Sequence, residues 1–187
     1  MRRRLLLTGP IGCGKSTLIA NALGGAIRNA GGFLTVRVVE NGRLAGFDLV
    51  PLPGAARERF LSFGQGGTVR DERPFTRTAP RLLKEAEGKK FALLDEIGGF
   101  ELLYPDFYEA LTHFFFSGTP CVGVLKALPG AEELSRRVQL PKEYMEAAAQ
   151  LRELLASDPD TMILETTGRY DFNAEGALRH WAEEYAV

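Results

Sequence analysis

The sequence predicts an α/β fold in which helices cover both faces of a mostly parallel sheet. Short apolar runs alternate along the chain with longer segments of helical spacing, which is typical of parallel strands joined by crossover helices. Two β-rich runs around an Asn-Gly dipeptide add an antiparallel β-hairpin after the first helix. Because the chain has 187 residues, about the length of one domain, we expect a single domain over 1–187.

The first predicted strand is the continuous apolar run Leu5–Leu7, which is typical of a strand buried on both faces. Apolar residues at helical spacing follow from Lys15 to about Arg28, so this segment is expected to be an amphipathic helix. We expect the pair Gly31-Gly32 to end that helix, since glycine is common just past a helix C-terminus.

A β-hairpin is predicted at about 33–50, where Asn41-Gly42 lies between two β-rich runs. The following segment, 51–74, is rich in proline and glycine, so we expect a loop with one short strand near 60–63. Residues 64–73 form a long Gly-rich stretch. Such a stretch either closes over a substrate or is only mobile, and the sequence favours neither reading.

The second half of the chain alternates between helices and strands. The expected elements are a helix at 79–87, a strand at 91–94, a helix at 107–116, a strand at 120–125, two helices flanking Pro141, a strand at 162–164 and a helix at 174–185.

The composition of the chain bears on whether it binds nucleic acid or membranes and on where it is located. The 23 basic and 24 acidic residues give a net charge of −1, so no global field attracts nucleic acid or an anionic membrane. No run approaches the roughly 18 apolar residues that a membrane-spanning helix requires. The two cysteines, Cys13 and Cys121, fit a reduced protein better than a disulfide scaffold, so we expect a cytoplasmic location.

The segment Gly9–Ser16 matches the Walker A pattern G-x-x-x-x-G-K-[ST] at every fixed position. Backbone N–H groups of such a loop surround phosphate oxygens, and the following helix directs its positive dipole end at the anion. We expect Lys15 to reach the β- and γ-phosphates and the Ser16 hydroxyl to ligate Mg²⁺. The alternative is a chance match, but a buried strand before the loop and an amphipathic helix after it favour nucleoside triphosphate binding. The predicted nucleotide-binding residues of this segment are Gly9, Pro10, Ile11, Gly12, Cys13, Gly14, Lys15, Ser16 and Thr17.

Two carboxylates, Asp95 and Glu96, follow the apolar run 91–94. In open α/β sheets, ligands bind outside the carboxyl ends of the parallel strands. Asp95 is therefore predicted to hold the magnesium ion, directly or through water. Glu96 is predicted to act with Lys15 in catalysis, as the base that polarises an attacking water and accepts its proton. The alternative for Glu96 is a helix cap or an exposed side chain.

Three motifs occur in a recognisable order: Gly9–Ser16, then Gly32-Phe33 with Arg43–Asp48, then Asp95–Leu102. With these motifs, over about residues 3–126, the chain resembles the small nucleoside-triphosphatase family first described from a thermophilic bacterium, which has a human cancer-related member. The resemblance implies a three-layer P-loop NTPase fold. It also implies slow, magnesium-dependent hydrolysis of ATP, GTP and other nucleoside triphosphates to the diphosphate.

The same resemblance implies roles for two further residues. Glu101 would be a structural carboxylate near the site. The family tends to have an Asn-Arg pair in a late loop where the base lies, and this chain has Thr166–Arg169 there. Arg169 would then stack on the base, while the asparagine is absent.

The chain also departs from the family pattern. The family usually has Thr-Glu-Glu-Val-Arg where this chain has Thr35–Val39, so both carboxylates are absent. Gly99 stands where family members carry a lysine that would stabilise charge on the γ-phosphate. Arg37 and Lys126 are two candidates for supplying that charge. The alternatives are a solvent-facing strand residue for Arg37 and a surface charge for Lys126.

Two other classes of function remain open. One is a small-molecule or nucleotide kinase, in which an acceptor bound near residues 54–78 would receive the phosphoryl group. The other is a non-catalytic nucleotide sensor, which the departures from the family pattern keep in consideration. Asp95-Glu96 favours hydrolysis over the kinase, because a water-activating carboxylate is needed less when the nucleophile is a second substrate.

Overall fold

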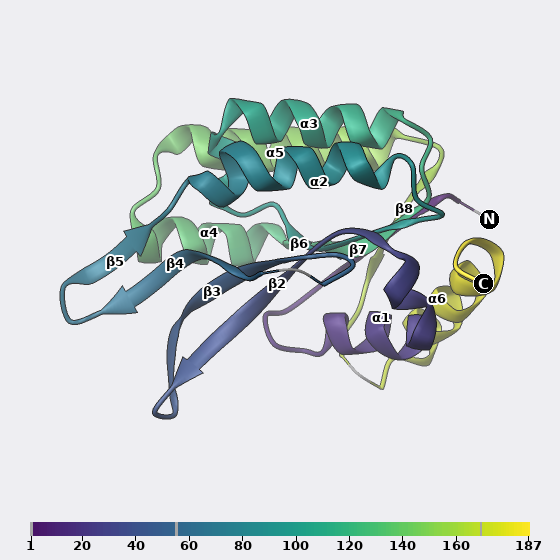
Figure 1. The fold of residues 1–187 in the computed structure, drawn as a ribbon, viewed down its shortest axis with the longest axis horizontal. Coiled ribbons are helices and arrows are strands. Elements are labelled where there is room, and N and C mark those ends of the chain that lie inside the picture. The colour runs from purple at the N-terminus through teal and green to yellow at the C-terminus, as the bar shows by residue number, and fades with distance from the viewer. Residues whose placement is uncertain (1, 55, 169) are drawn as a thin grey trace.

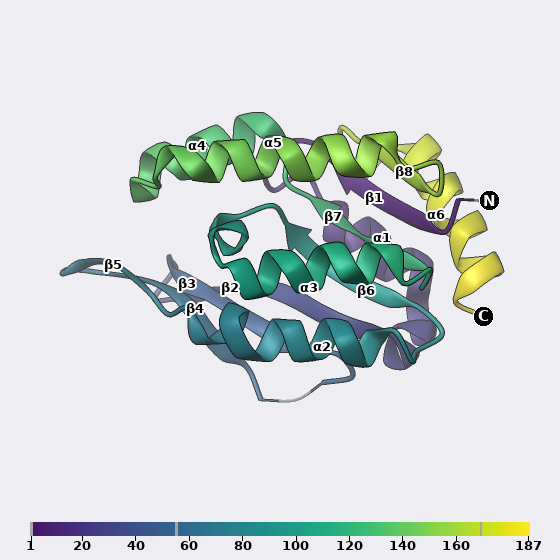
Figure 2. The ribbon, with the colours of Figure 1, turned by 90° about the horizontal axis from the view of Figure 1, so that it is seen from above.

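The computed structural model describes residues 2–54, 56–168 and 170–187. An eight-stranded sheet lies between two layers of helices (Figures 1 and 2), with the strand order β5-β4-β3-β2-β6-β7-β1-β8. The strands are β1 (Arg4–Thr8), β2 (Gly31–Glu40), β3 (Arg43–Pro51), β4 (Glu58–Gly64), β5 (Gly67–Arg70), β6 (Ala92–Ile97), β7 (Cys121–Leu125) and β8 (Thr161–Glu165). The helices are α1 (Lys15–Leu23), α2 (Ala79–Ala86), α3 (Pro105–Phe116), α4 (Leu128–Val138), α5 (Lys142–Ser157) and α6 (Phe172–Tyr185), with shorter 3-10 or π turns at Gly24–Asn29, Pro74–Thr78 and Phe100–Leu103.

The sheet has a parallel part and an antiparallel part. Strands β2, β6, β7, β1 and β8 run parallel to one another, whereas β3, β4 and β5 are added by antiparallel pairing. The predicted three-layer α/β fold and the hairpin after the first helix are therefore confirmed. Among the described residues, none of the helices has the length and apolar character needed to span a bilayer.

The core is divided by the sheet, as the alternation of side chains along a strand requires. Leu6 of β1 packs with residues of α2, α3 and α5 on one face. Its neighbours Leu5 and Leu7 pack with residues of α1 and α6 on the other. Figure 1 shows these two helical layers above and below the sheet.

The first helix is shorter than predicted, and the glycines assigned to its end lie in a strand. Helix α1 ends at Leu23, and Gly24, at a φ of 49°, starts a 3-10 turn. Gly31 and Gly32 are the first residues of β2. A Cβ atom on Gly32 would lie 2.5 Å from the carbonyl oxygen of Leu93, so glycine permits the close approach of β2 to β6.

The segment expected to be mostly loop contains a second hairpin, β4–β5, so that prediction is too short by one strand. Strand β4 contributes Phe60, whose ring lies 4.9 Å from the ring of Phe75 and 5.9 Å from that of Phe100. This aromatic packing holds β4, which is the short strand expected near 60–63, against the rest of the core. The whole of β5 is exposed, so its sequence carries no burial pattern.

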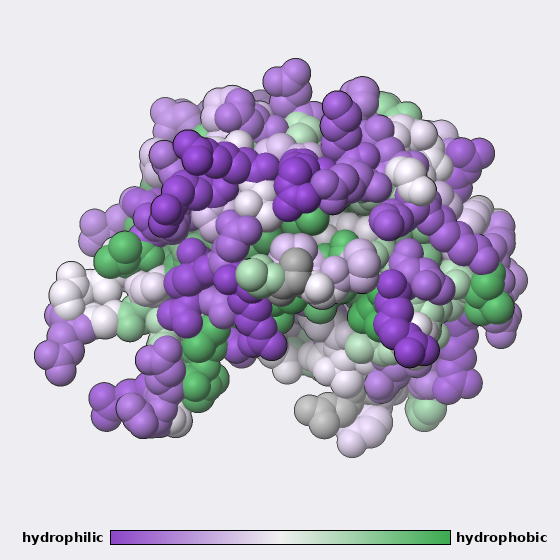
Figure 3. Space-filling view, in the orientation of Figure 1, coloured by the Kyte–Doolittle hydropathy of each residue, from purple (hydrophilic) through white to green (hydrophobic). Residues whose placement is uncertain are grey.

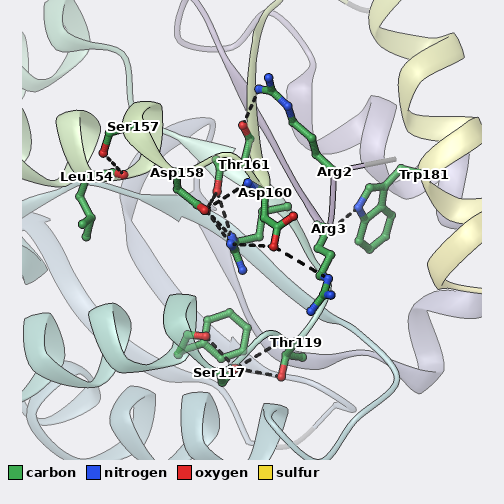
Figure 4. A network of polar contacts seen from close by, with 12 residues as sticks. Arg2, Arg3, Ser117, Thr119, Leu154, Ser157, Asp158, Asp160, Thr161 and Trp181 are labelled. Atoms are coloured by element: carbon green, nitrogen blue, oxygen red, sulfur yellow. Dashed lines mark hydrogen bonds and ion pairs between the residues drawn. The ribbon is translucent and has the colours of Figure 1, made fainter.

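Polar side chains join β1 to β8 at the amino edge of the parallel strands (Figure 4). The Arg4 guanidinium donates through Nε to Asp158 Oδ2 and to Thr161 Oγ1, both at 2.9 Å, and through Nη2 to Asp158 Oδ2 at 2.5 Å. Trp181 of α6 donates from Nε1 to the carbonyl oxygen of Arg3 at 3.0 Å. Both ends of the chain lie at this edge (Figure 1).

Candidate nucleotide-binding site

The phosphate loop connects β1 to α1 at the opposite, carboxyl edge of the strands. Gly9, Gly12 and Gly14 have φ angles of 143°, 77° and 104°, which side chains with a Cβ atom rarely adopt. At Gly9 a Cβ atom would also lie 2.2 Å from the carbonyl oxygen of Thr166. Gly14 begins α1 without a side-chain cap, so the first N–H groups of the helix remain available to an anion.

Lys15 lies across its own loop. Its Nζ donates to the carbonyl oxygens of Gly9 at 3.0 Å and Pro10 at 2.7 Å. These are interactions within eight residues of chain, so phosphate oxygens at the loop would compete for the same ammonium group. Cys13 Sγ lies 4.0 Å from the carbonyl oxygen of Thr166 and 3.8 Å from Lys15 Nζ, and the Cys13 N–H donates to the carbonyl oxygen of Pro10 within the loop.

Ser16 and Asp95 meet across the gap between α1 and β6, where Ser16 Oγ donates to Asp95 Oδ1 at 2.8 Å. Burial raises the pKa of Asp95 to about 6, against the lowering effect of the Ser16 hydrogen bond. A hydroxyl and a carboxylate oxygen at this separation fit Mg²⁺, which prefers oxygen ligands and takes few of them from the protein. A cation here would also favour the ionised carboxylate.

Glu96 adopts a left-handed backbone conformation, with a φ of 64°. The pairing of β6 with β7 shifts register between Leu94 and Ile97, and such a bulge re-aims a side chain. Glu96 Oε1 forms an ion pair with Lys126 Nζ. Burial acts to raise the pKa of Glu96, but the charge and the hydrogen bond of Lys126 outweigh it, so the pKa lies below the ordinary range.

Glu101 holds the turn that follows β6. Its Oε1 accepts from the N–H groups of Gly98 at 2.8 Å and Gly99 at 2.7 Å, and the Tyr144 hydroxyl donates to the carbonyl oxygen of Gly98 at 2.9 Å. The carboxylate is buried, which raises its pKa although the backbone hydrogen bonds lower it. Glu101 therefore fixes the position of the strand end that carries Asp95 and Glu96.

A cleft of about 980 Å³ joins these groups. Its walls are the phosphate loop, residues 34–37 of β2, the carboxylates of β6 and the segment 126–130 that leads into α4. In Figure 3 it corresponds to the indentation between the lobe of the β2–β3 hairpin and the part of the surface that contains α1.

Most of the predicted site residues line this single cleft. They are Gly9, Pro10, Ile11, Gly12, Gly14, Lys15, Ser16, Thr17, Asp95 and Glu96. Cys13 is a loop residue outside the lining, and residues 64–73 contribute nothing to it, being part of the β4–β5 hairpin and the turn after it. Arg169 lies outside the described residues, so its predicted contact with the base stays a prediction.

The sequence did not indicate the contribution of α4. The start of this helix faces the phosphate loop, since a Cβ atom on Gly130 would lie 3.7 Å from the side chain of Ile11. Pro129, Gly130 and Glu133 line the cleft. Proline near the start of a helix was the available local signal, but it does not say which face of the molecule the helix end meets.

The fold and this arrangement of loop and carboxylates define a phosphate-loop nucleotide-binding protein. Comparison with known proteins gives the family. A family model described as NTPase matches residues 4–156, so the chain belongs to this nucleoside-triphosphatase family.

Individual relatives agree with this assignment. The chain is 32% identical over 142 residues to nucleoside-triphosphatase THEP1 of Thermotoga sp. (strain RQ2), covering 72% of this chain and 81% of that protein. It is 32% identical over 150 residues to the cancer-related nucleoside-triphosphatase of Homo sapiens, covering 69% and 76%.

Two solved structures share the fold. The crystal structure of THEP1 from Aquifex aeolicus has a TM-score of 0.60 at 20% identity, covering 98% of this chain and 99% of that chain. The solution structure of the human cancer-related nucleoside triphosphatase has a TM-score of 0.62 at 23% identity, covering 97% and 96%.

Proposed function

We propose that the cleft binds a nucleoside triphosphate with Mg²⁺ and hydrolyses it to the diphosphate and phosphate. The observation that supports this most directly is the 2.8 Å contact between Ser16 Oγ and Asp95 Oδ1, with Glu96 at the next position of the same strand. A metal-binding pair beside a candidate base at a phosphate loop is what hydrolysis of a phosphoanhydride requires.

Each residue has a distinct task in this proposal. The loop N–H groups and Lys15 bind the β- and γ-phosphates, with the Lys15 ammonium exchanging its present carbonyl partners for phosphate oxygens. Ser16 and Asp95 would hold Mg²⁺, which neutralises charge on the β- and γ-phosphate oxygens when bound.

The proposed base is Glu96, whose Oε1 is paired with Lys126. Its other oxygen accepts a proton from the water that attacks the γ-phosphorus. The bond from the γ-phosphorus to the bridging oxygen breaks, and the diphosphate leaves with that oxygen. All of these contacts are made to the phosphates and the metal ion, which ATP and GTP have in common. Both nucleotides are therefore proposed substrates.

The remaining proposals concern the domain organisation of the protein and its location in the cell. The cleft takes residues from Gly9 to Glu165, which supports one domain over 1–187. Cys13 and Cys121 are both free thiols, which supports activity in the reducing environment of the cytoplasm.

The test is phosphate release from ATP and GTP, with Mg²⁺ and with a chelator. We expect turnover in Mg²⁺ that is lost on chelation. Glu96→Gln should keep nucleotide binding and lose about 100-fold or more in turnover, because the amide cannot accept the proton. Glu132→Gln, an exposed substitution on α4, is the matched control.

Two outcomes would favour the other functions. Formation of diphosphate and a phosphorylated small molecule, without free phosphate, would identify a phosphotransferase. Bound nucleotide with no turnover under any of these conditions would identify a sensor. Unchanged turnover in Glu96→Gln would remove Glu96 from the proposed role.

A further inference from the structure

The cleft contains a third basic side chain in addition to Lys15 and Lys126. Arg37 lies on β2 and lines the same cleft as those lysines and Glu96. Strand β2 pairs directly with β6, with Phe33 opposite Leu94. Arg37 is thus farther along β2, toward the carboxyl edge at which the phosphate loop lies.

The pairing of β2 with β3 fixes the face toward which Arg37 points. Thr35 lies opposite Leu49, and Arg37 lies opposite Phe47. Residues directly opposite each other in an antiparallel pair project from the same face. Leu49 and Phe47 belong to the core under α2, α3 and α5. Arg37 therefore projects from this face of the sheet, beyond the buried residues and toward the carboxyl edge.

Glu96 and Lys126 line the same cleft as Arg37. They lie in β6 and directly after β7, the two strands that follow β2 in the order of the sheet. Arg37, Glu96 and Lys126 therefore line the cleft together with the phosphate loop, where the γ-phosphate would lie.

The three cations differ in what they already bind. Lys126 is paired with Glu96, and Lys15 is hydrogen-bonded to two carbonyl oxygens of its loop. Within residues 2–54, 56–168 and 170–187, the Arg37 guanidinium has no hydrogen bond or ion pair and is exposed. A guanidinium presents several N–H donors in a plane, which matches the oxygens of a phosphate.

We propose that Arg37 binds the terminal phosphate of the bound nucleoside triphosphate and stabilises its charge during hydrolysis, as a catalytic residue supplied by the β2–β3 hairpin of the same chain. This inference rests on the proposed function. Arg37 forms and breaks no covalent bond. It donates hydrogen bonds to γ-phosphate oxygens whose charge changes as the bond to the leaving diphosphate breaks.

A contact with the terminal phosphate has a signature that a general surface charge lacks. The triphosphate has the phosphate that Arg37 binds, and the diphosphate does not. The affinity for a triphosphate should therefore depend on Arg37 much more than the affinity for a diphosphate does.

The experiment compares wild type with Arg37→Ala, Arg37→Lys and the control Arg43→Ala. Arg43 is exposed at the start of β3 in the same hairpin and does not line the cleft. Calorimetry with Mg²⁺ gives the dissociation constants for the β,γ-imido analogue of ATP and for ADP. Phosphate release from ATP gives kcat and KM, and circular dichroism checks that each variant is folded.

We expect Arg37→Ala to weaken binding of the imido analogue roughly 10-fold or more, the value of one charged hydrogen bond, and ADP binding by about twofold or less. We also expect kcat to fall roughly 100-fold or more, as for other arginines at a transferred phosphate. Arg37→Lys should recover part of both losses, because it restores the charge without the planar donors. Arg43→Ala should match wild type.

Equal losses for the imido analogue and ADP in Arg37→Ala would overturn the assignment to the terminal phosphate. An unchanged kcat would overturn the role in hydrolysis. The binding arm does not need turnover, so a wild type that binds the analogue through Arg37 without hydrolysing ATP would reject the proposed function and keep the contact. A wild type that binds neither nucleotide would reject both.

Discussion

Charged side chains lie at both the amino and the carboxyl edges of the parallel strands, but their hydrogen-bond partners differ between the two edges. At the amino edge, Arg4 is buried and its guanidinium is hydrogen-bonded to Asp158 and Thr161. At the carboxyl edge, Lys15 is hydrogen-bonded within its own loop, to the carbonyl oxygens of Gly9 and Pro10 and to Cys13 Sγ. There Glu96 also has a left-handed backbone conformation.

The charged groups of the amino edge therefore stabilise the fold, whereas those of the carboxyl edge are available to bind a ligand. Removing one partner of a buried ion pair costs stability, because the other charge is left in the protein without compensation. A strained or partly satisfied polar group costs stability and is retained where a ligand completes its interactions. The two edges should therefore respond to substitution in opposite ways.

The largest expected effect is on turnover at the carboxyl edge. Lys15→Met should lower turnover by about 100-fold or more, since it removes a cation from the phosphates. The free energy of unfolding should change by less than about 0.5 kcal/mol, as for other substitutions outside a structural network. Lys142→Met, at an exposed position of α5, controls for loss of a lysine. Phosphate release and urea unfolding measure the two effects, and a large loss of stability in Lys15→Met would break the comparison.

The amino edge should show the reverse pattern. Arg4→Met keeps an apolar stem but removes the guanidinium that pairs with Asp158, which retains the hydrogen bond from the Thr161 hydroxyl. We expect a loss of about 2–3 kcal/mol in the free energy of unfolding with unchanged turnover per folded molecule. Arg3→Met is the control, because Arg3 is half-exposed with a 4.0 Å ion pair to Asp160, which contributes little. Reduced turnover with unchanged stability in Arg4→Met would contradict this assignment.

Glu101 sharpens the comparison, because it lies near the carboxyl edge but is satisfied within the protein. Glu101→Ala would release the N–H groups of Gly98 and Gly99 and the strand end they position. We expect about 10-fold slower turnover and a loss of about 1–2 kcal/mol in stability. Glu101→Gln keeps an acceptor oxygen and should retain most of both. Equal damage in the two variants would show that the negative charge, and not the position of the turn, is what matters.

The smallest effect concerns pH at the amino edge. Burial acts to raise the pKa of Asp158, but hydrogen bonds from Thr161 and Arg4 outweigh it and lower the pKa. A lowered folded-state pKa contributes stability above the ordinary carboxyl value, near 3.9, and loses it as the pH falls further. The stability gap between wild type and Asp158→Asn should thus be constant from pH 7 to about 5 and shrink below about 4. Urea unfolding across this range checks it, and a gap that widens in acid would reverse the sign.

The parts of the molecule that can be predicted from the sequence are those whose function requires particular residue types at a fixed local spacing. The phosphate loop needs glycine and lysine at fixed spacing, so Gly9–Ser16 can be placed from residue types alone. Strand β5 could not be predicted, because all four of its residues are exposed and its sequence therefore shows no alternation of buried and exposed positions.

The same limit applies to the cations of the site. The sequence offered Arg37 and Lys126 as alternatives for one charge. The structure pairs Lys126 with Glu96, thirty positions earlier, through the adjacency of β6 and β7. Strand order is a property of the whole sheet, and no local pattern near Lys126 encodes it.

The position of the chain ends has a practical consequence. The backbone of Arg3 is held by Trp181 of α6, and both ends lie at the edge of the sheet away from the phosphate loop (Figure 2). A tag, a surface tether or a fused domain attached at either end would leave the mouth of the cleft facing outward. Immobilised protein should consequently remain open to nucleotides, which makes binding measurements on a sensor surface practicable for every variant named above.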